Sequence, residues 1–214
     1  MDTVLADSKE HQTRSVIAKN SENTEIAFVA CLLKCLAEML QKEANMQGIA
    51  EFHKVSFNQF IQDAKKNGFV SDEIDPEIVK VIWDKIKLPI RATGGSAGYD
   101  FYLPFPFSLE AGSTVTIPTG IKVDIQPGWF LGLVPRSGLG FKYGMRLLNT
   151  FGVIDCDYIY ADNEGHIMAK ITCETNMCLN DGDRFMQGIF IPHGTTRSDS
   201  TNGVRTGGFG STGE

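Results

Sequence analysis

The spacing of apolar residues changes in character near Arg91. Before this residue, apolar side chains recur every three or four positions, which is the period of an amphipathic helix. After it they alternate with polar or small residues, which is the period of a β-strand. The pattern therefore predicts a mainly β protein preceded by an α-helical N-terminal region.

A stripe of five apolar residues predicts the first helix, which should end between residues 45 and 48. The stripe consists of Ile26, Val29, Leu33, Leu36 and Leu40. Such a stripe needs a partner, and two heptads are too few to indicate a coiled coil. We expect it to pack on the rest of the same subunit, with a separate partner as the alternative.

Two shorter helices are predicted before Arg91. Ser56 is a suitable N-cap for a helix that Asn67-Gly68 would close. Asp75 and Pro76 have the residue types of an N-cap and a first helical position, and Pro89 follows the expected end of that helix. We find no catalytic constellation in these helices.

Alternating segments follow one another after Arg91, separated by Gly and Pro turns about every 8–12 residues. They cover residues 115–117, 121–125, 129–133 and 167–171. This spacing predicts an antiparallel jelly roll or β-barrel rather than a parallel α/β sheet.

Four regions result from this pattern. Residues 1–20 lack a period and are expected to form a mobile N-terminus, and residues 21–91 the helical region. Residues 92–192 form the predicted β domain. Residues 193–214 contain little to bury and should form a flexible tether that leads to a glycine-rich arm.

Glycine and charge narrow the class of ligand. Of 22 glycines, only Gly48 and Gly68 precede residue 92, so nearly all lie in the β part. The net charge is −6, and neither part has the basic excess that binding to a nucleic acid needs. We therefore expect no direct contact with nucleic acid, and a polyanionic ligand would need a few placed cations, backbone amides or a metal.

The five cysteines indicate a reduced, cytoplasmic protein, because their number is odd, no CxxC pair occurs and no signal sequence opens the chain. A zinc site is possible on residue type alone, but its four candidates lack paired spacing. They are Cys173, Cys178, His166 and His193. The longest apolar run has eight residues, from Ile26 to Leu33, too short to cross a bilayer.

Five segments of the β part are difficult to explain as packing alone. They are Ala97–Phe101, Pro135–Gly140, Gly152–Tyr158, Gly182–Gln187 and Arg205–Gly213. The second offers an Arg, a hydroxyl and glycine-freed amides, as a phosphate site requires, although a plain turn would also explain it. Arg184 in the fourth segment suggests a hairpin with a local ion pair. Phe209 in the last could stack on a base as part of a mobile lid, with a frayed tail as the alternative.

Two aspartates in the third segment flank Cys156. On an extended chain Asp155 and Asp157 would point to opposite faces, so only one could enter a site. A lone carboxylate can act as a general base toward water or hold metal-bound water. Asp100 is a second candidate for the metal role.

Taken together and in this order, the five segments resemble the five motifs of the trimeric dUTP pyrophosphatase (dUTPase) family. The resemblance covers residues 86–213. It implies a jelly-roll homotrimer with three active sites shared between subunits, which hydrolyses dUTP to dUMP and pyrophosphate with Mg²⁺. Such an enzyme limits uracil incorporation into DNA and supplies dUMP.

The resemblance also assigns roles to residues. Asp155 is similar to the general base, and Asp100 to the acid that holds Mg²⁺ through water. Tyr158 resembles the residue that packs on deoxyribose, and Asn149 and Gly152 resemble the elements that read uracil. The substrate contacts it implies are Arg136, Ser137, Gly138, Asn149, Gly152, Tyr158, Gln187, Arg205, Phe209, Gly210, Ser211 and Thr212.

Three departures from the family pattern stand out. Residues 159–164 replace a single residue, which enlarges the uracil hairpin by five. Arg205 lies one residue closer to Phe209 than is usual. Gly188 follows Gln187 where an aliphatic residue is more common, and we expect this to alter packing only.

Two alternative functions stay open from the sequence. A dCTP deaminase of the same fold would need a glutamate where Asp155 stands and a further Arg soon after Ser137. A regulatory protein could instead use the β part to sense a nucleotide and the N-terminal helices to bind a protein partner.

Overall fold

A computed structural model describes residues 32–36, 48–203, 205 and 207, and the chain divides into two units, residues 1–48 and 49–214. In the first unit residues 32–36 are helical. The other stripe residues, Ile26, Val29 and Leu40, and the expected end of that helix before Gly48 lie outside the described residues. The prediction that residues 1–20 are mobile also falls outside them.

The prediction that residues 21–91 are helical is wrong at two places. Strand β1 (Ala50–Lys54) pairs antiparallel with β6 (Ile121–Ile125), and β2 (Ile90–Arg91) pairs with β3 (Tyr99–Tyr102). The cause at β1 is Phe52, whose ring packs against the rings of Tyr99, Phe101 and Phe190. Burial of an aromatic ring on a sheet outweighs the helical pattern on either side. The β part therefore begins at Ala50 and not at residue 92, within a unit that starts at residue 49.

Both short helices form with the predicted caps. In α2 (Phe57–Lys66) the hydroxyl of Ser56 accepts a hydrogen bond from the Gln59 amide, and in α3 (Pro76–Lys85) Asp75 accepts one from Glu77. The two helices enclose a small core of their own with a loop of the β part. Its buried residues are Val55, Phe60, Ala64, Val70, Val79 and Phe105.

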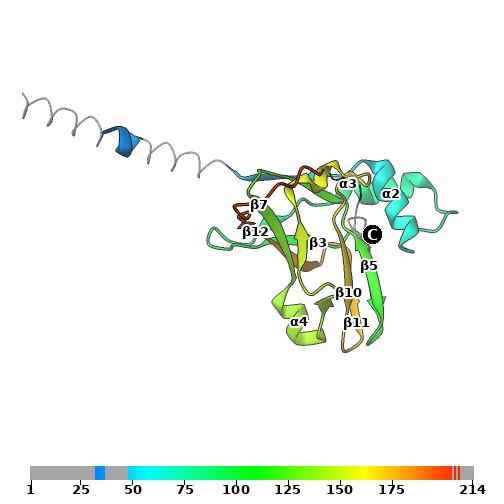
Figure 1. Ribbon diagram of the computed structural model, residues 1–214. Coiled ribbons are helices and arrows are strands. Elements are labelled where there is room, and N and C mark those ends of the chain that lie inside the picture. The colour runs from blue at the N-terminus through cyan, green and yellow to red at the C-terminus, as the bar shows by residue number, and fades with distance from the viewer. Residues whose placement is uncertain (1–31, 37–47, 204, 206, 208–214) are drawn as a thin grey trace, which may run out of the picture. The chain divides into compact units, whose positions relative to one another are not determined.

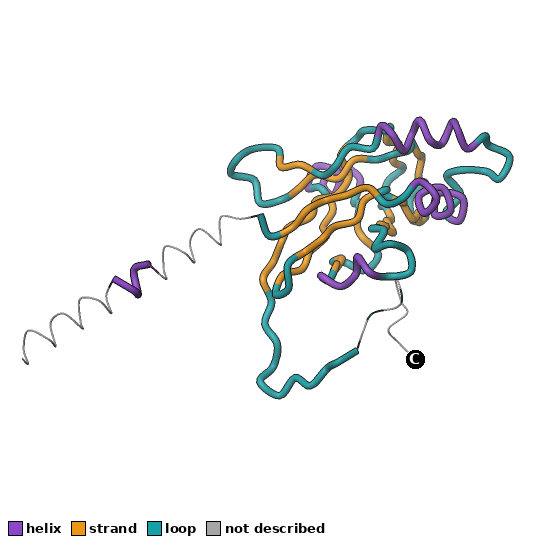
Figure 2. The backbone as a smooth tube through the Cα atoms, turned by 90° about the horizontal axis from the view of Figure 1, so that it is seen from above, coloured by secondary structure: helices purple, strands orange, loops and turns teal. Residues whose placement is uncertain are grey.

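The remaining strands form antiparallel sheets in a jelly-roll-like, mainly β arrangement (Figures 1 and 2). The largest sheet has the order β2-β3-β12-β7-β9, and the others are β5-β10-β8, β11-β4 and β1-β6. The bounds are β4 (Phe107–Leu109), β5 (Thr114–Pro118), β7 (Trp129–Pro135), β8 (Arg146–Leu147), β9 (Gly152–Ile154), β10 (Met168–Thr172), β11 (Met177–Leu179) and β12 (Arg184–Pro192). A helix α4 (Ser137–Tyr143) and a 3₁₀ turn η1 (Cys156–Tyr160) follow β7 and β9.

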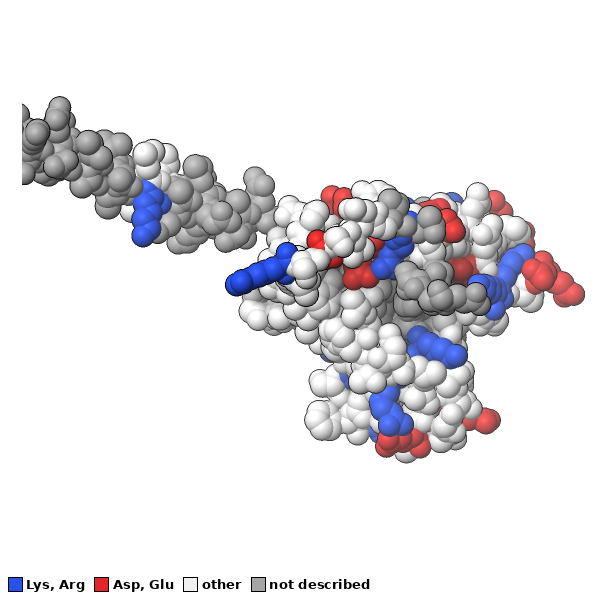
Figure 3. Space-filling model, in the orientation of Figure 1, with Lys and Arg blue, Asp and Glu red and all other residues white. Residues whose placement is uncertain are grey.

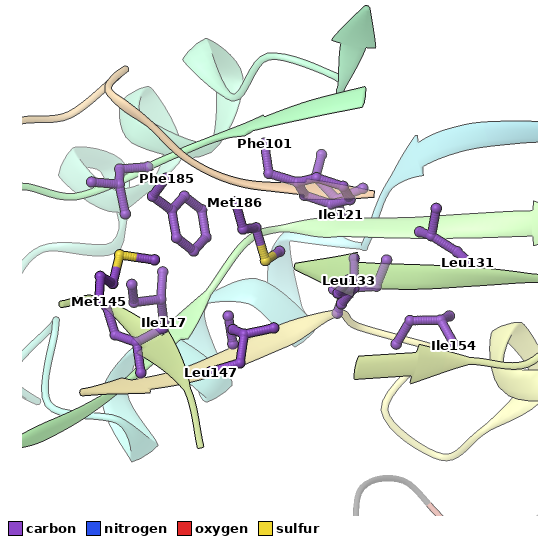
Figure 4. Close-up of a cluster of buried hydrophobic side chains, with 14 of the residues drawn as sticks. Phe101, Ile117, Ile121, Leu131, Leu133, Met145, Leu147, Ile154, Phe185 and Met186 are labelled. Carbon is purple, nitrogen blue, oxygen red and sulfur yellow. The ribbon is translucent and has the colours of Figure 1, made fainter. Parts of the chain in front are cut away.

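Side chains from several sheets meet in one core (Figure 4). Gly188 explains one departure from the family pattern, because a Cβ there would lie 2.7 Å from Leu131 Cδ1 and 3.0 Å from Phe101 Cε2. Leu131 and Phe101 thus fill the space that a side chain at position 188 would take. The core fixes β3, β7 and β12 in register, and these strands carry the polar residues described next.

Candidate active site

Four polar side chains converge where β3, β12 and the end of β7 meet, and we call them the Asp100 cluster. Asp100 is only 2% exposed. Its carboxylate accepts hydrogen bonds from Arg184 Nη1 and Gln187 Nε2, both at 3.0 Å, and lies 3.3 Å from Arg136 Nε. Both carboxylate oxygens therefore accept a hydrogen bond, and the contacts hold the two Arg and the Gln in place.

Arg184 departs from the sequence-based interpretation, which gave it a local ion pair beside Asp183. It pairs instead with Asp100, 84 residues away, because β12 and β3 lie side by side. Gly98 leaves room for this arrangement, since a Cβ there would lie 3.2 Å from the Gln187 side chain.

Ser137 and Gly138 occupy the first turn of α4, and Arg136 is its N-cap. The backbone N–H groups of a first helical turn have no partner within the helix, so they are suited to an acceptor such as phosphate. The predicted phosphate-binding segment is thus a short helix start beside the Asp100 cluster rather than a plain turn.

A second group, the Asp155 cluster, contains Asp155, Asp157, Tyr158 and Arg205. Arg205 donates from Nη2 to Asp155 at 2.5 Å and from Nε to Asp157 at 2.9 Å, and its guanidinium lies 5.7 Å from the centre of the Tyr158 ring. The prediction that the two aspartates face opposite ways is wrong. The strand ends at Ile154 and Asp157 already belongs to η1, so both carboxylates bind one guanidinium.

Tyr158 is buried with its hydroxyl in a network. The hydroxyl donates to the His166 carbonyl at 3.0 Å and accepts from Asn163 Nδ2 at 2.9 Å. Burial raises the pKa of Tyr158 despite the hydrogen bond from Asn163, which lowers it. The phenol therefore remains a proton donor at neutral pH.

A pocket of about 310 Å³ lies next to β9 and contains two residues predicted to read a base. Asn149 supplies an amide among largely apolar neighbours. Gly152 gives close access to the backbone, since a Cβ there would lie 2.9 Å from Leu133 Cβ. The pocket is lined by Thr116, Leu133, Leu147, Leu148, Asn149, Gly152, Met168, Ala169 and Lys170. A flat polar ring would fit such a lining.

The Asp100 and Asp155 clusters lie far apart within one chain. Asp100 aligns across β12 with Val134, whereas Ile154, just before Asp155, aligns with Leu131. The separation is about three strand spacings and four residues, or roughly 14 Å across and 13 Å along the sheet. In Figure 1 α4 lies at the lower end of the folded unit and the yellow turn of η1 at the upper end.

The described part of the chain contains no group of three His, Cys, Asp or Glu side chains that could hold a metal ion. The zinc alternative is therefore not supported for Cys173, Cys178, His166 and His193. Mg²⁺ needs fewer protein ligands than zinc, because it often keeps several waters and is bound by one or two carboxylates together with substrate phosphates. Asp100 offers one such carboxylate, and each of its oxygens keeps a lone pair beside the hydrogen bond that it accepts.

Phe209, Gly210, Ser211 and Thr212 lie outside the described residues. Residues 193–203 form neither helix nor strand.

Among the described helices, none is long and apolar enough to cross a membrane. On the face shown in Figure 3, Lys and Arg of the folded unit stand singly or beside Asp and Glu.

Comparison with known proteins gives consistent matches. The family model described as dUTPase matches residues 84–213. The deoxyuridine 5'-triphosphate nucleotidohydrolase of Lactococcus lactis is 40% identical over 133 residues, which are 60% of this chain and 89% of the relative. That of Paraburkholderia xenovorans is 37% identical over 138 residues, 60% of this chain and 90% of the relative. The crystal structure of a Streptococcus mutans dUTPase matches at 35% identity with a TM-score of 0.47, over 59% of this chain and 94% of that one.

Proposed function

Because the chain belongs to the dUTPase family and is a dUTP diphosphatase, we propose that Asp155 is the general base of its reaction. In this proposal Asp155 activates a water for in-line attack on the α-phosphate of dUTP, which gives dUMP and pyrophosphate. The reaction would limit uracil incorporation into DNA and supply dUMP.

The exposure and partner of Asp155 support this role and carry the proposal. Its side chain is 48% exposed, so water can reach it, and it is held in this structure by Arg205. Arg205 would be attracted to an incoming triphosphate, because guanidinium groups bind phosphate strongly. Transfer of Arg205 to the substrate would release Asp155 to accept a proton, a contribution of about 10²–10⁴-fold in rate.

The Asp100 cluster is suited to the phosphates. Arg136, Ser137, Gly138 and Gln187 would contact phosphate oxygens, and Asp100 would orient Arg136 and Gln187. Mg²⁺, held by the phosphates and by Asp100 through water, would supply positive charge that offsets the charge of the triphosphate.

The apolar pocket is suited to the nucleoside. Asn149 and the backbone at Gly152 would read the edge of uracil, and Tyr158 would pack on deoxyribose. Phe209, Gly210, Ser211 and Thr212 would then close over the substrate with Arg205.

We propose that the complete site forms between copies of the chain in a homotrimer. A general base must lie about 3 Å from its water, yet the Asp155 cluster and the Asp100 cluster are separated by a much larger distance in one chain. One copy would therefore supply Asp155, and its neighbour would supply Arg136, Ser137 and Gln187.

The proposed reaction is tested by measuring pyrophosphate release from dUTP and ammonia release from dCTP in parallel, with and without Mg²⁺. We expect pyrophosphate from dUTP only, and only with the metal. Ammonia without pyrophosphate would instead identify a deaminase.

A second function, binding of a protein partner, is favoured by one observation in the first unit. Leu32, Leu33 and Leu36 of the helical segment are each more than half exposed. Because the folded unit begins at residue 49, removal of residues 1–48 should leave hydrolysis largely intact and alter assembly or partner capture. Loss of hydrolysis in a truncated protein that still folds and assembles would show that these residues belong to the active site.

A further inference from the structure

A buried pair joins helix α2 to the loop that follows η1. Asp63 Oδ2 lies 2.6 Å from His166 Nδ1, and the imidazole is fully buried. The other ring nitrogen, Nε2, accepts the Gly120 N–H at 2.8 Å. Nε2 therefore carries no proton, which places the ring proton on Nδ1, where it is donated to Asp63.

The same loop is held at a second point by the start of α2. Glu164 accepts hydrogen bonds from the Ser56 amide at 2.9 Å, the Ser56 hydroxyl at 2.5 Å and Lys122 Nζ at 3.1 Å. Its φ of 57° lies in the left-handed region, which a residue other than glycine keeps only where its surroundings impose it. Thus Glu164 is fixed at the N-cap of α2 and His166 near the end of that helix.

This loop contains residues 161–164, which are most of those that enlarge the family's uracil hairpin, and it follows the turn η1 that carries Tyr158. The His166 carbonyl accepts the Tyr158 hydroxyl, and Asn163 donates to the same hydroxyl. The Tyr158 ring in turn faces Arg205, which binds Asp155. A continuous set of contacts therefore runs from Asp63 on α2 to the carboxylate that we propose as the base.

We propose that Asp63 and His166 are positioning residues for hydrolysis, and that α2 thereby sets the orientation of Tyr158 against the sugar. Neither residue touches substrate in this proposal. The inference rests on the proposed function of Tyr158 and Asp155, and it assigns an enzymatic role to a helix outside the segment that matches the family, residues 84–213.

Discrimination between dUTP and UTP is the appropriate measurement. A loosely held Tyr158 would exclude a 2′-hydroxyl less well, whereas a smaller fraction of folded enzyme would lower both rates equally and leave their ratio unchanged. We expect Asp63→Ala to lower the ratio of kcat/KM for dUTP to that for UTP about tenfold, since displaced groups near the reacting centre cost factors of this size or more. Asp63→Asn keeps an acceptor for Nδ1–H and should restore most of the ratio.

Two further variants make the test decisive. Val79→Ala removes buried contacts of the same helical pair but no hydrogen bond to the loop, so it should lower thermal stability and leave the ratio unchanged. Glu164→Ala should lower the ratio less than Asp63→Ala, and it replaces that variant should Asp63→Ala not fold.

An unchanged ratio in both Asp63→Ala and Glu164→Ala would overturn the inference, as would an equal fall in Val79→Ala. Absence of dUTP hydrolysis by the unmodified protein would instead reject the proposed function itself.

Discussion

Two carboxylates near opposite ends of β7 differ in their surroundings: Asp100 lies on β3, and Asp155 directly follows β9. Asp100 is buried, and three side chains contact its oxygens, whereas Asp155 is about half exposed and is held by Arg205, which a phosphate could draw away. An enclosed carboxylate with fixed donors is suited to hold those donors in position. An open one with a displaceable partner is suited to take a proton. The difference explains why these two aspartates would serve different purposes.

Replacing Asp155 by Asn should have the largest effect on turnover. We expect kcat for dUTP to fall about 10²–10⁴-fold, because the amide cannot accept the proton of water. Binding of dUTP, measured by calorimetry, should persist because the pocket and phosphate contacts remain. Unchanged turnover would exclude Asp155 as the base.

Mixing two inactive variants tests whether the two ends of β7 serve different sites. Asp155→Asn keeps an intact Asp100 cluster, and Arg136→Ala keeps an intact Asp155 cluster. When the two are co-expressed, roughly a quarter of the sites should contain both intact clusters, by random pairing of copies in a closed ring.

The double variant Asp155→Asn/Arg136→Ala expressed alone is the control and should stay inactive. A mixture as inactive as either parent would indicate that one chain supplies the whole site.

The enclosed and the open carboxylate should also differ in their contribution to stability. Asp100→Asn should lower the free energy of unfolding by about 1–3 kcal/mol, because it weakens buried charge-assisted hydrogen bonds. The loss of stability stays moderate because its partners Arg136 and Arg184 are partly exposed and can form hydrogen bonds with water instead. Asp155→Asn should stay within about 0.5 kcal/mol of the unmodified protein in urea denaturation. An equal loss of stability in Asp100→Asn and Asp155→Asn would contradict the distinction between the enclosed and the open carboxylate.

Lowering the pH should have a smaller effect on stability, through the carboxyls of Asp63 and Glu164. Burial tends to raise the pKa of Asp63 and of Glu164, but hydrogen bonds from His166 and Gln59, and from Ser56 and Lys122, lower both. The folded pKa values lie below the ordinary 3.8 and 4.5, so the stabilisation is present above these values and is lost as the pH falls through them.

The free energy of unfolding should therefore fall more steeply with acid in the unmodified protein than in Asp63→Asn/Glu164→Gln, between about pH 5 and pH 3. Val79→Ala removes no titrating group and should keep the original slope. The same slope in all three proteins would show that these carboxyls do not contribute.

Local patterns could be predicted from the sequence, and long-range pairings could not. The caps at Ser56 and Asp75 each depend on neighbouring residues, and both are confirmed. The phosphate-binding role of the segment at Arg136 also rests on neighbouring residues and stays a prediction. By contrast, Asp63 and His166 are 103 residues apart and neither lies in a motif. Only the fold brings them together.

The errors have equally specific causes. Strand β1 is five residues long and lies close before a helix, so its alternation was too short to oppose the helical period. Asp155 and Asp157 would face opposite ways only on a strand, and the strand ends one residue earlier, at Ile154. The sequence shows that residues 159–164 are additional, but nothing nearby in it indicates that Glu164 contacts Ser56.

Strand β1 also determines where the chain can be cut. It is the only described strand that pairs with β6, whose inward residues Ile121, Val123 and Ile125 are buried. A fragment that begins at residue 84, where the family match starts, would lack β1 and present β6 as an open, apolar edge. Such edges recruit strands from other molecules. The segment that carries the family's motifs would thus be prone to aggregate on its own. Residues 49–83 prevent this because their strand β1 covers the edge of β6.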